Sequence, residues 1–155
     1  MNKIINDEYF MNEALKEAKK SYELNEVPVG AVIVKDNRII ARAHNLKELN
    51  NNSLDHAELI AIKKASKKLN TWRLTDCSLY VTLEPCPMCA GAILQSRISN
   101  LYIGTLDPKG GACKSKLNLL KDYKFNHDVN IYYDICQDEC SKLLKSFFKE
   151  LRSNK

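Results

Sequence analysis

The sequence predicts an α/β protein in which helices cover both faces of a five-stranded mixed sheet, a three-layer αβα fold. Two observations predict it. Segments with helical periodicity alternate with short apolar segments, and one pair of apolar segments is joined by a tight turn. The chain has 155 residues, 45% of them hydrophobic and 28% charged, which is the composition and length of one ordinary globular domain.

The first helix is predicted by an apolar stripe near the N-terminus. Its members are Met11, Leu15, Ala18 and Tyr22. Asp7 is a suitable N-cap for this helix. VGAVIVKD (29–36) and RIIARAHN (38–45) then predict two strands joined by a turn at Asp36-Asn37. The first strand is almost entirely apolar, as expected of a strand that is buried on both faces.

The middle of the chain alternates helix, strand and helix. A second helix is expected from His56 onward. Its apolar stripe comprises Leu59, Ile62, Ala65 and Leu69. SLYVTL (78–83) predicts a third strand, and it leads directly into Cys86–Cys89, a segment that opens a third helix.

The same alternation continues to the C-terminus. NLYIGT (100–105) predicts a fourth strand, and DPKGGA (107–112) is a glycine-rich loop. KLNLLKDY (116–123) has the spacing of a short helix, and DVNIYYDI (128–135) predicts a fifth strand. A last helix is expected over 136–151.

Composition restricts the compartment and the class of partner. The N-terminal sequence lacks the apolar core of a signal peptide, and no apolar run approaches the ~20 residues of a membrane span, so we expect a cytoplasmic protein with no membrane association. The net charge of +5 is small for a nucleic-acid-binding protein, but basic residues gather at 63–73, 109–124 and 142–155. Each cluster alone is typical of a solvated helix face, whereas their recurrence favours a polyanionic partner.

The cysteine pair in LEPCPMCAG (83–91) allows three interpretations. Cys86 and Cys89 could form half of a structural zinc site, a redox pair or part of a catalytic metal centre. Six cysteines in a cytoplasmic protein are expected to stay reduced. A structural zinc site needs a second closely spaced pair of ligands. The remaining candidates are better explained as core or hydrogen-bonded residues: Cys77, Cys113, Cys136, Cys140, His44 and His127.

His56 differs from those candidates because it opens a predicted helix and Glu58 lies two positions after it. HxE and PCxxC both begin helices, so the side chains of His56, Cys86 and Cys89 can converge. Three ligands leave a fourth zinc position for water, and zinc lowers the pKa of bound water to about 7. Glu58 can then carry the proton to a substrate ring nitrogen and to a departing amine. This combination is the known signature of zinc-dependent nucleobase deaminases.

The chain also resembles the bacterial tRNA-specific adenosine deaminases over nearly its whole length. The segments that carry the resemblance are VPVGAV (27–32), HN (44–45), HAE (56–58), LYVTLEPCPMCAGAI (79–93), SRI (96–98), DPKGGA (107–112), FNH (125–127) and DEC…LL…FF (138–148). HAE with PCxxC marks the wider superfamily only, and the other segments are more specific.

This resemblance implies a cytidine-deaminase-like fold and a single zinc-dependent deaminase domain over residues 1–155. It implies hydrolytic conversion of the wobble adenosine to inosine in the anticodon stem-loop of an arginine tRNA, by a homodimer with one Zn²⁺ per subunit. The implied zinc ligands are His56, Cys86 and Cys89, and the implied proton shuttle is Glu58.

The resemblance further implies four substrate contacts. Asn45 would contact the flipped-out nucleoside, Val29 would form part of the pocket wall, and Asp107 with Lys109 would contact neighbouring RNA. Taken without the resemblance, Asn45 is a turn residue at a strand end and Asp107 starts an Asp-Pro turn.

Some residues depart from the family pattern. Leu54 and Asp55 stand before HAE where smaller residues are usual, and Asp55 could cap the helix. Lys114 and Lys116 flank Ser115 where the family usually has a glycine and less charge. These departures concern RNA contacts and leave the reaction type unchanged.

Two rival functions remain open. One is a small-molecule deaminase of the same superfamily that acts on guanine or cytosine. The other is a non-catalytic RNA-binding zinc module, which would have no need of Glu58. The basic clusters and the loop 107–112 favour RNA, because a free base requires no phosphate contacts.

Overall fold

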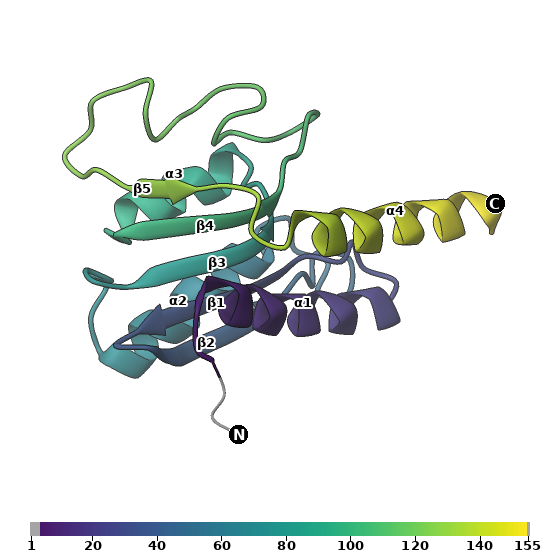
Figure 1. Ribbon diagram of the computed structural model, residues 1–155, viewed down its shortest axis with the longest axis horizontal. Helices are drawn as coiled ribbons and strands as arrows, with labels where there is room; N and C mark the ends of the chain where they lie inside the picture. The colour runs from purple at the N-terminus through teal and green to yellow at the C-terminus, as the bar shows by residue number, and fades with distance from the viewer. Residues whose placement is uncertain (1–3, 155) are drawn as a thin grey trace.

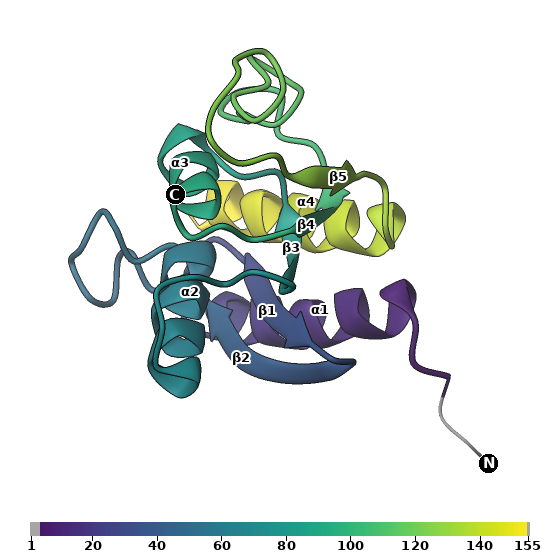
Figure 2. The same cartoon turned by 90° about the vertical axis from the view of Figure 1, so that its left-hand side faces the viewer.

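The computed structural model describes residues 4–154 as three layers (Figure 1). A five-stranded sheet forms the middle layer. Helices α1 (Asp7–Glu23) and α4 (Gln137–Ser153) cover one face, and α2 (Ala57–Leu69) and α3 (Pro87–Gln95) cover the other (Figure 2). The predicted αβα fold is therefore confirmed. Within residues 4–154, no helix combines the length and the apolar character that crossing a membrane requires.

The sheet is mixed, as predicted, with the strand order β2-β1-β3-β4-β5. Its strands are β1 (Gly30–Lys35), β2 (Arg38–His44), β3 (Ser78–Leu83), β4 (Asn100–Thr105) and β5 (Asn130–Tyr132). β1 is antiparallel to both of its neighbours, whereas β3, β4 and β5 are parallel. Because β3 and β4 are parallel neighbours, the segments that follow them leave the same edge of the sheet, which is where α/β proteins commonly place their sites.

β1 and β2 form the predicted hairpin. The turn residues Asp36 and Asn37 have φ angles of 51° and 60°, which a type I′ turn requires and which Asp and Asn tolerate. β1 is buried over most of its length because α1 lies on one of its faces and α2 on the other. Gly30 permits the close approach of α1, since a Cβ there would lie 1.9 Å from the carbonyl oxygen of Ala14.

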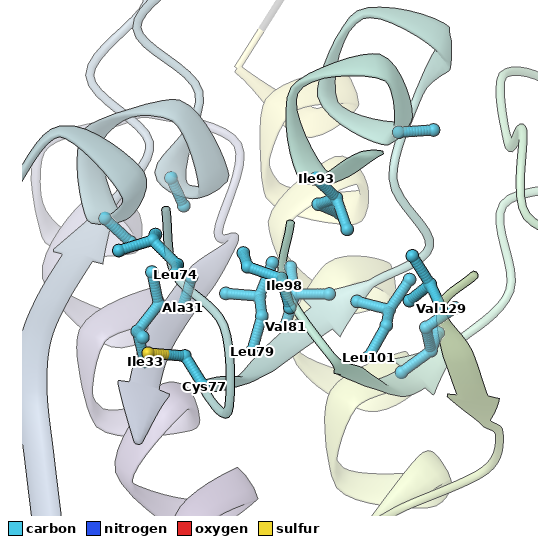
Figure 3. Close-up of a cluster of buried hydrophobic side chains, with 14 of the residues drawn as sticks. Ala31, Ile33, Leu74, Cys77, Leu79, Val81, Ile93, Ile98, Leu101 and Val129 are labelled. Atoms are coloured by element: carbon cyan, nitrogen blue, oxygen red, sulfur yellow. The ribbon is translucent and has the colours of Figure 1, made fainter. Parts of the chain in front are cut away.

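The larger hydrophobic core lies between the sheet and the layer formed by α2 and α3. Figure 3 shows side chains of β1, β3, β4 and α3 that meet in this core, among them Ala31, Ile33, Leu79, Val81, Ile93 and Leu101. α2 faces the core with Ala57, Ala61 and Ala65, all fully buried. These small side chains at four-residue spacing let α2 lie close against the strands. This packing fixes the N-terminal end of α2, where His56 lies.

The prediction of a short helix over 116–123 is wrong. The backbone N–H of Leu119 donates to the Ala112 carbonyl over 2.8 Å, and Cys113 forms an isolated β-bridge with Asn118. These pairings hold the segment against residues 112 and 113, and it forms turns instead of a helix. Tertiary contacts therefore override the apolar spacing of this segment.

The fifth strand and the start of the first helix also differ from the prediction. The fifth strand is only three residues long, Asn130–Tyr132. The N-cap of α1 is Asn6, whose Oδ1 accepts a hydrogen bond from the backbone N–H of Tyr9 over 2.9 Å. Asp7, the predicted N-cap, instead accepts a hydrogen bond from the Tyr80 hydroxyl over 2.6 Å. That bond ties the first turn of α1 to the middle of the sheet.

Candidate active site

Two helix N-termini meet beside the end of β3. His56 is the N-cap of α2 and Cys86 is the N-cap of α3, and both have extended backbone. Pro87 takes the first position of α3, where its missing N–H leaves no hydrogen bond unmade, and Cys89 follows in the same turn. The positive end of each helix dipole favours an anionic thiolate at this position.

The side chains of His56, Cys86 and Cys89 converge as the sequence predicts. Their ligand atoms lie within 4.8 Å of one another. Within residues 4–154, no other group of three or more His, Cys, Asp or Glu side chains is placed to hold a metal ion. The Nδ1 atom of His56 lies 3.7 Å from the Sγ atom of Cys86 and 3.5 Å from that of Cys89. Tetrahedral zinc, with bonds of about 2.3 Å to sulfur and about 2.1 Å to nitrogen, separates such atoms by about 3.6 Å. The donor set therefore fits zinc, and with three ligands it matches a catalytic site instead of a four-ligand structural one.

The pKa values of the two cysteines in this group are shifted in opposite directions. A hydrogen bond from Cys89, helped by His56 and opposed by burial, lowers the pKa of Cys86 to about 4. The hydrogen bond to Cys86, together with burial, raises the pKa of Cys89. Hydrogen bonding to Cys86 likewise raises the pKa of His56. Of the two thiols, Cys86 therefore has the greater thiolate character.

Glu58 lies in the first turn of α2, two residues after His56, and only 4% of its surface is exposed. Burial raises the pKa of its carboxyl to about 7, and the nearby Cys86 contributes in the same direction. Such a carboxyl gains and loses a proton near neutral pH, which is the property that general acid–base catalysis requires. One helix end therefore places a candidate metal ligand beside a candidate proton carrier.

A pocket of about 190 Å³ opens beside these side chains. Its lining includes six of the eight residues predicted from the sequence: Val29, Asn45, His56, Glu58, Cys86 and Asp107. The other two lie outside the lining, because Cys89 is fully buried and Lys109 is exposed on the loop after β4. The structure therefore brings segments that follow β2, β3 and β4 together around one cavity.

Asn45 follows β2, and local hydrogen bonds fix its side chain. Its Nδ2 donates to the Val27 carbonyl over 3.1 Å, and its Oδ1 accepts from the backbone N–H of Lys47 over 3.2 Å. The Ser21 hydroxyl donates to the Asn45 carbonyl over 2.7 Å, which ties this backbone to α1. A primary amide has two donors and two lone pairs, so the Asn45 side chain keeps capacity for a ligand. Val29, 9% exposed, lies on the same wall.

Asp107 combines a turn with a place in the pocket lining. Its Oδ1 accepts hydrogen bonds from the backbone N–H groups of Lys109 and Gly110, over 3.1 Å and 3.3 Å. This is the turn expected of an Asp-Pro sequence. Because Asp107 also lines the pocket, the turn and substrate-contact interpretations of this residue are compatible.

A groove of about 640 Å³ lies beside the pocket, and we call it the α4 groove. It shares three lining residues with the pocket: Val27, Leu83 and Asp107. Leu144 and Phe148 of α4 add apolar surface. Its cationic residues are Lys109, Lys145 and Arg152. The α4 groove therefore extends the pocket along a surface with both apolar and positively charged side chains.

Glu84 is a pocket residue that the sequence interpretation missed. It follows β3, is 2% exposed, and accepts hydrogen bonds from the backbone N–H groups of Asp107, Cys113 and Ser115 and from the Ser115 hydroxyl. Burial favours a raised pKa for this carboxyl, but the hydrogen bonds, led by those from Ser115, lower it below its ordinary value. The one sequence signal was its position between a buried strand and Pro85-Cys86.

Among the described residues, the remaining cysteines and histidines are not members of the ligand group. Cys77, Cys113 and Cys140 are buried, and Cys136 is half-buried. The Nε2 atom of His127 donates to the Ile98 carbonyl over 2.6 Å, and the Nδ1 atom of His44 lies 3.3 Å from a carboxylate oxygen of Glu17. These placements agree with the predicted structural roles. Asp55, by contrast, accepts a hydrogen bond within its own loop and does not cap α2.

Comparisons with known proteins agree with this geometry. Residues 5–152 match the family model of MafB19-like deaminases. The chain is 51% identical to the tRNA-specific adenosine deaminase of Bacillus subtilis over 149 residues, which cover 96% of this chain and 92% of that protein. It is 49% identical to the tRNA-specific adenosine deaminase of Aquifex aeolicus over 148 residues, which cover 95% and 97%.

Solved structures show the same fold. A structure from studies of A-to-I editing by tRNA:A34 deaminases has a TM-score of 0.85 at 43% identity, and the match covers 88% of this chain and 99% of that one. A guanine deaminase from Nitrosomonas europaea has a TM-score of 0.78 at 20% identity, with 94% and 86% covered, and shares the fold alone. The chain belongs to the family of bacterial tRNA-specific adenosine deaminases.

Proposed function

We propose that this chain is a zinc-dependent hydrolase that converts the wobble adenosine of an arginine tRNA to inosine. The observation that carries the proposal is the position of Glu58, a buried carboxyl beside a three-ligand group in the lining of a pocket. Membership of the tRNA-specific adenosine deaminase family supports the substrate class.

The reaction consumes one water and releases one ammonia for each adenosine. Zinc held by His56, Cys86 and Cys89 would supply a water molecule whose pKa is lowered toward neutrality. Glu58 accepts a proton at its carboxylate and delivers it to a purine ring nitrogen. A second proton passes through the same carboxyl to the departing amino group, which leaves as ammonia. The raised pKa of Glu58, about 7, suits both directions of transfer.

The pocket would receive the adenine base after it leaves the anticodon stack, because a stacked base cannot present its amino-bearing carbon to a buried carboxyl. Val29 would pack against the base, and the free hydrogen-bonding capacity of Asn45 would orient the nucleoside. The Asn45 side chain is already held by hydrogen bonds to the backbone of Val27 and Lys47, so binding of the nucleoside costs little side-chain conformational entropy.

The α4 groove would hold nucleotides beside the flipped adenosine. Phe148 is 40% exposed there, which suits stacking on a base, and Lys109, Lys145 and Arg152 suit phosphate groups. Asp107 stands between the pocket and the groove and would contact the nucleotide that links them. The enzyme would act on the anticodon stem-loop as a cytoplasmic homodimer with one zinc ion in each subunit.

The α4 groove also bears on the rival functions. A deaminase of free guanine or cytosine needs no cationic groove beside its pocket. A non-catalytic zinc module has no need of a buried carboxyl beside the metal ligands, since burying Glu58 without a proton-transfer role costs stability.

A substrate panel tests the proposal. The purified zinc-loaded enzyme is incubated with arginine tRNA that carries an ACG anticodon, with free adenosine, and with free guanine and cytosine, and the products are analysed by mass spectrometry. We expect inosine at the wobble position of the tRNA and no turnover of the free compounds. Deamination restricted to a free base would exclude the proposal.

A further inference from the structure

We infer that Glu84 is a positioning residue whose carboxylate holds the loop of residues 107–115 beside the pocket, and so presents Asp107 and Lys109 to the RNA. The RNA part of this inference rests on the proposed function. The placement begins in the sheet, where Leu83 at the end of β3 pairs with Thr105 at the end of β4. Glu84 and the loop therefore leave adjacent strands at the same edge.

The hydrogen bonds divide evenly between the two carboxylate oxygens. Oε1 accepts from the Asp107 N–H over 3.0 Å and from the Ser115 hydroxyl, and Oε2 accepts from the Cys113 and Ser115 N–H groups over 3.0 Å and 2.9 Å. All four donors belong to the loop. Because they come from its first residue and from two of its last three, Cys113 and Ser115, one side chain fixes both of its ends.

Gly111 shows how closely the loop wraps this carboxylate. A Cβ at position 111 would lie 2.2 Å from the Glu84 Cδ atom and 2.4 Å from each of its oxygens. The backbone of Gly111 has no positive φ, so the requirement for glycine is one of space and not of conformation. The N–H of Ala112 also donates to the Pro85 carbonyl over 2.9 Å, which continues the contact toward Cys86.

A second buried carboxylate provides a matched control. Glu26, 1% exposed, accepts hydrogen bonds from the backbone N–H groups of Glu48 and Leu49 over 3.2 Å and 2.7 Å. The loop that Glu26 holds carries Lys47, which, like Asp107, lines the pocket. Glu26 and Glu84 thus hold different loops by the same means, so each substitution should loosen only its own loop.

The test compares three variants of the zinc-loaded protein by amide hydrogen exchange. Glu84→Gln keeps the shape of the side chain but has one accepting oxygen, so two of the four donors lose their acceptor. We expect exchange protection at residues 107, 113 and 115 to fall by about tenfold or more, as loss of a charge-assisted hydrogen bond implies. Ser115→Ala should give a smaller loss in the same loop. Glu26→Gln should reduce protection at 48 and 49 and leave 107–115 unchanged.

Steady-state kinetics then separate positioning from a general structural effect. For Glu84→Gln we expect the KM for tRNA to rise by about tenfold and kcat to change by less than about threefold, because the loop contacts bind RNA and do not enter the chemical step. The zinc content should equal that of the wild type. A kcat that falls while KM is unchanged would overturn the inference.

The exchange measurement keeps this inference separate from the proposed function. If the wild-type enzyme failed to deaminate tRNA, the proposed function would fail while the exchange data still tested the loop. Wild-type protection at 107, 113 and 115 in Glu84→Gln would overturn the positioning role whatever the activity. Should that variant not fold, unchanged loop protection in Ser115→Ala would overturn it instead.

Discussion

The Nδ1 atom of His56 lies 3.5 Å from the Sγ atom of Cys89, 33 residues later in the chain. This spacing arises because α2 and α3 lie side by side on one face of the sheet and begin at the same edge (Figure 2). The metal-ligand group is therefore a product of helix packing, and the same packing buries Glu58 beside it.

Replacing Glu58 by alanine or glutamine should leave zinc bound and abolish most turnover. Glu58 is not one of the three ligands, so zinc per chain should stay at the wild-type value. Loss of a positioned acid–base group should lower kcat by about a hundredfold to ten-thousandfold. Metal analysis and single-turnover kinetics measure the two effects, with Glu48→Gln, an exposed carboxyl in the loop after Asn45, as the control. A near wild-type rate in the Glu58 variants would show that the proton carrier lies elsewhere.

Replacing Cys86 by alanine should remove most of the zinc and lower the melting temperature, because a metal that binds only the folded state stabilises it. Cys140→Ala is the matched control. Cys140 is 1% exposed, and its sulfur would lie 2.5 Å from a Cβ at Gly104, so it acts as a small core residue. That variant should lose about 1 kcal/mol of stability and keep its zinc. Equal zinc content in the two variants would contradict the ligand assignment.

The α4 groove should make tRNA binding depend on salt. In the double variant Lys145→Ala/Arg152→Ala, binding should weaken, and the slope of log affinity against log salt should fall by about one for each phosphate that is no longer neutralised. The comparison is Lys63→Ala/Lys67→Ala, which removes two exposed cations of α2 that line neither the pocket nor the groove. A slope for Lys145→Ala/Arg152→Ala equal to that of the wild type would mean that α4 does not meet the RNA backbone.

Glu17 should make the stability of the protein depend on acid pH. Burial favours a raised pKa for this carboxyl, but hydrogen bonds from Lys20 and His44 outweigh burial and lower the pKa below its ordinary value of 4.5. The folded protein therefore binds the proton less well than the unfolded chain. The contribution of Glu17 is present above the unfolded-state pKa and is lost as the pH falls through the folded-state pKa.

Denaturant unfolding at several pH values measures this contribution. Below its ordinary pKa of 4.5, the free energy of unfolding of the wild type should decline more steeply than that of Glu17→Gln. Glu23→Gln, at the exposed end of the same helix, should follow the wild type. Parallel curves for Glu17→Gln and the wild type would contradict the assignment.

Much of the fold could be predicted because its signals are local. The apolar segment 78–83 forms β3 within those same bounds, and Asp36-Asn37 forms the expected turn. HxE and PCxxC mark helix starts, so His56 and the Cys86–Cys89 segment could be placed at the beginnings of helices before any contact between them was known. Local patterning and turn chemistry decide these features, and tertiary contacts reinforce them.

The wrong helix prediction over 116–123 and the omission of Glu84 have a different cause. The segment 116–123 carries helical spacing, yet its backbone pairs with residues that precede it, and no periodicity within the segment records that pairing. Glu84 was missed for the same reason. Its hydrogen-bond donors lie between 23 and 31 residues away, at Asp107 and Ser115, so its role depends on a loop that the motif does not contain. Long-range pairings of this kind follow from the assembled sheet edge.

The most direct test of the central claim follows the oxygen atom of the product. The zinc-loaded enzyme is incubated with arginine tRNA that carries an ACG anticodon, in water labelled with the heavy oxygen isotope, and the digested tRNA is analysed by mass spectrometry. Hydrolysis within this site predicts inosine at the wobble position that carries one solvent oxygen, and no inosine with Glu58→Ala. An unmodified wobble adenosine with the wild-type enzyme, or labelled inosine formed equally well by Glu58→Ala, would contradict the account.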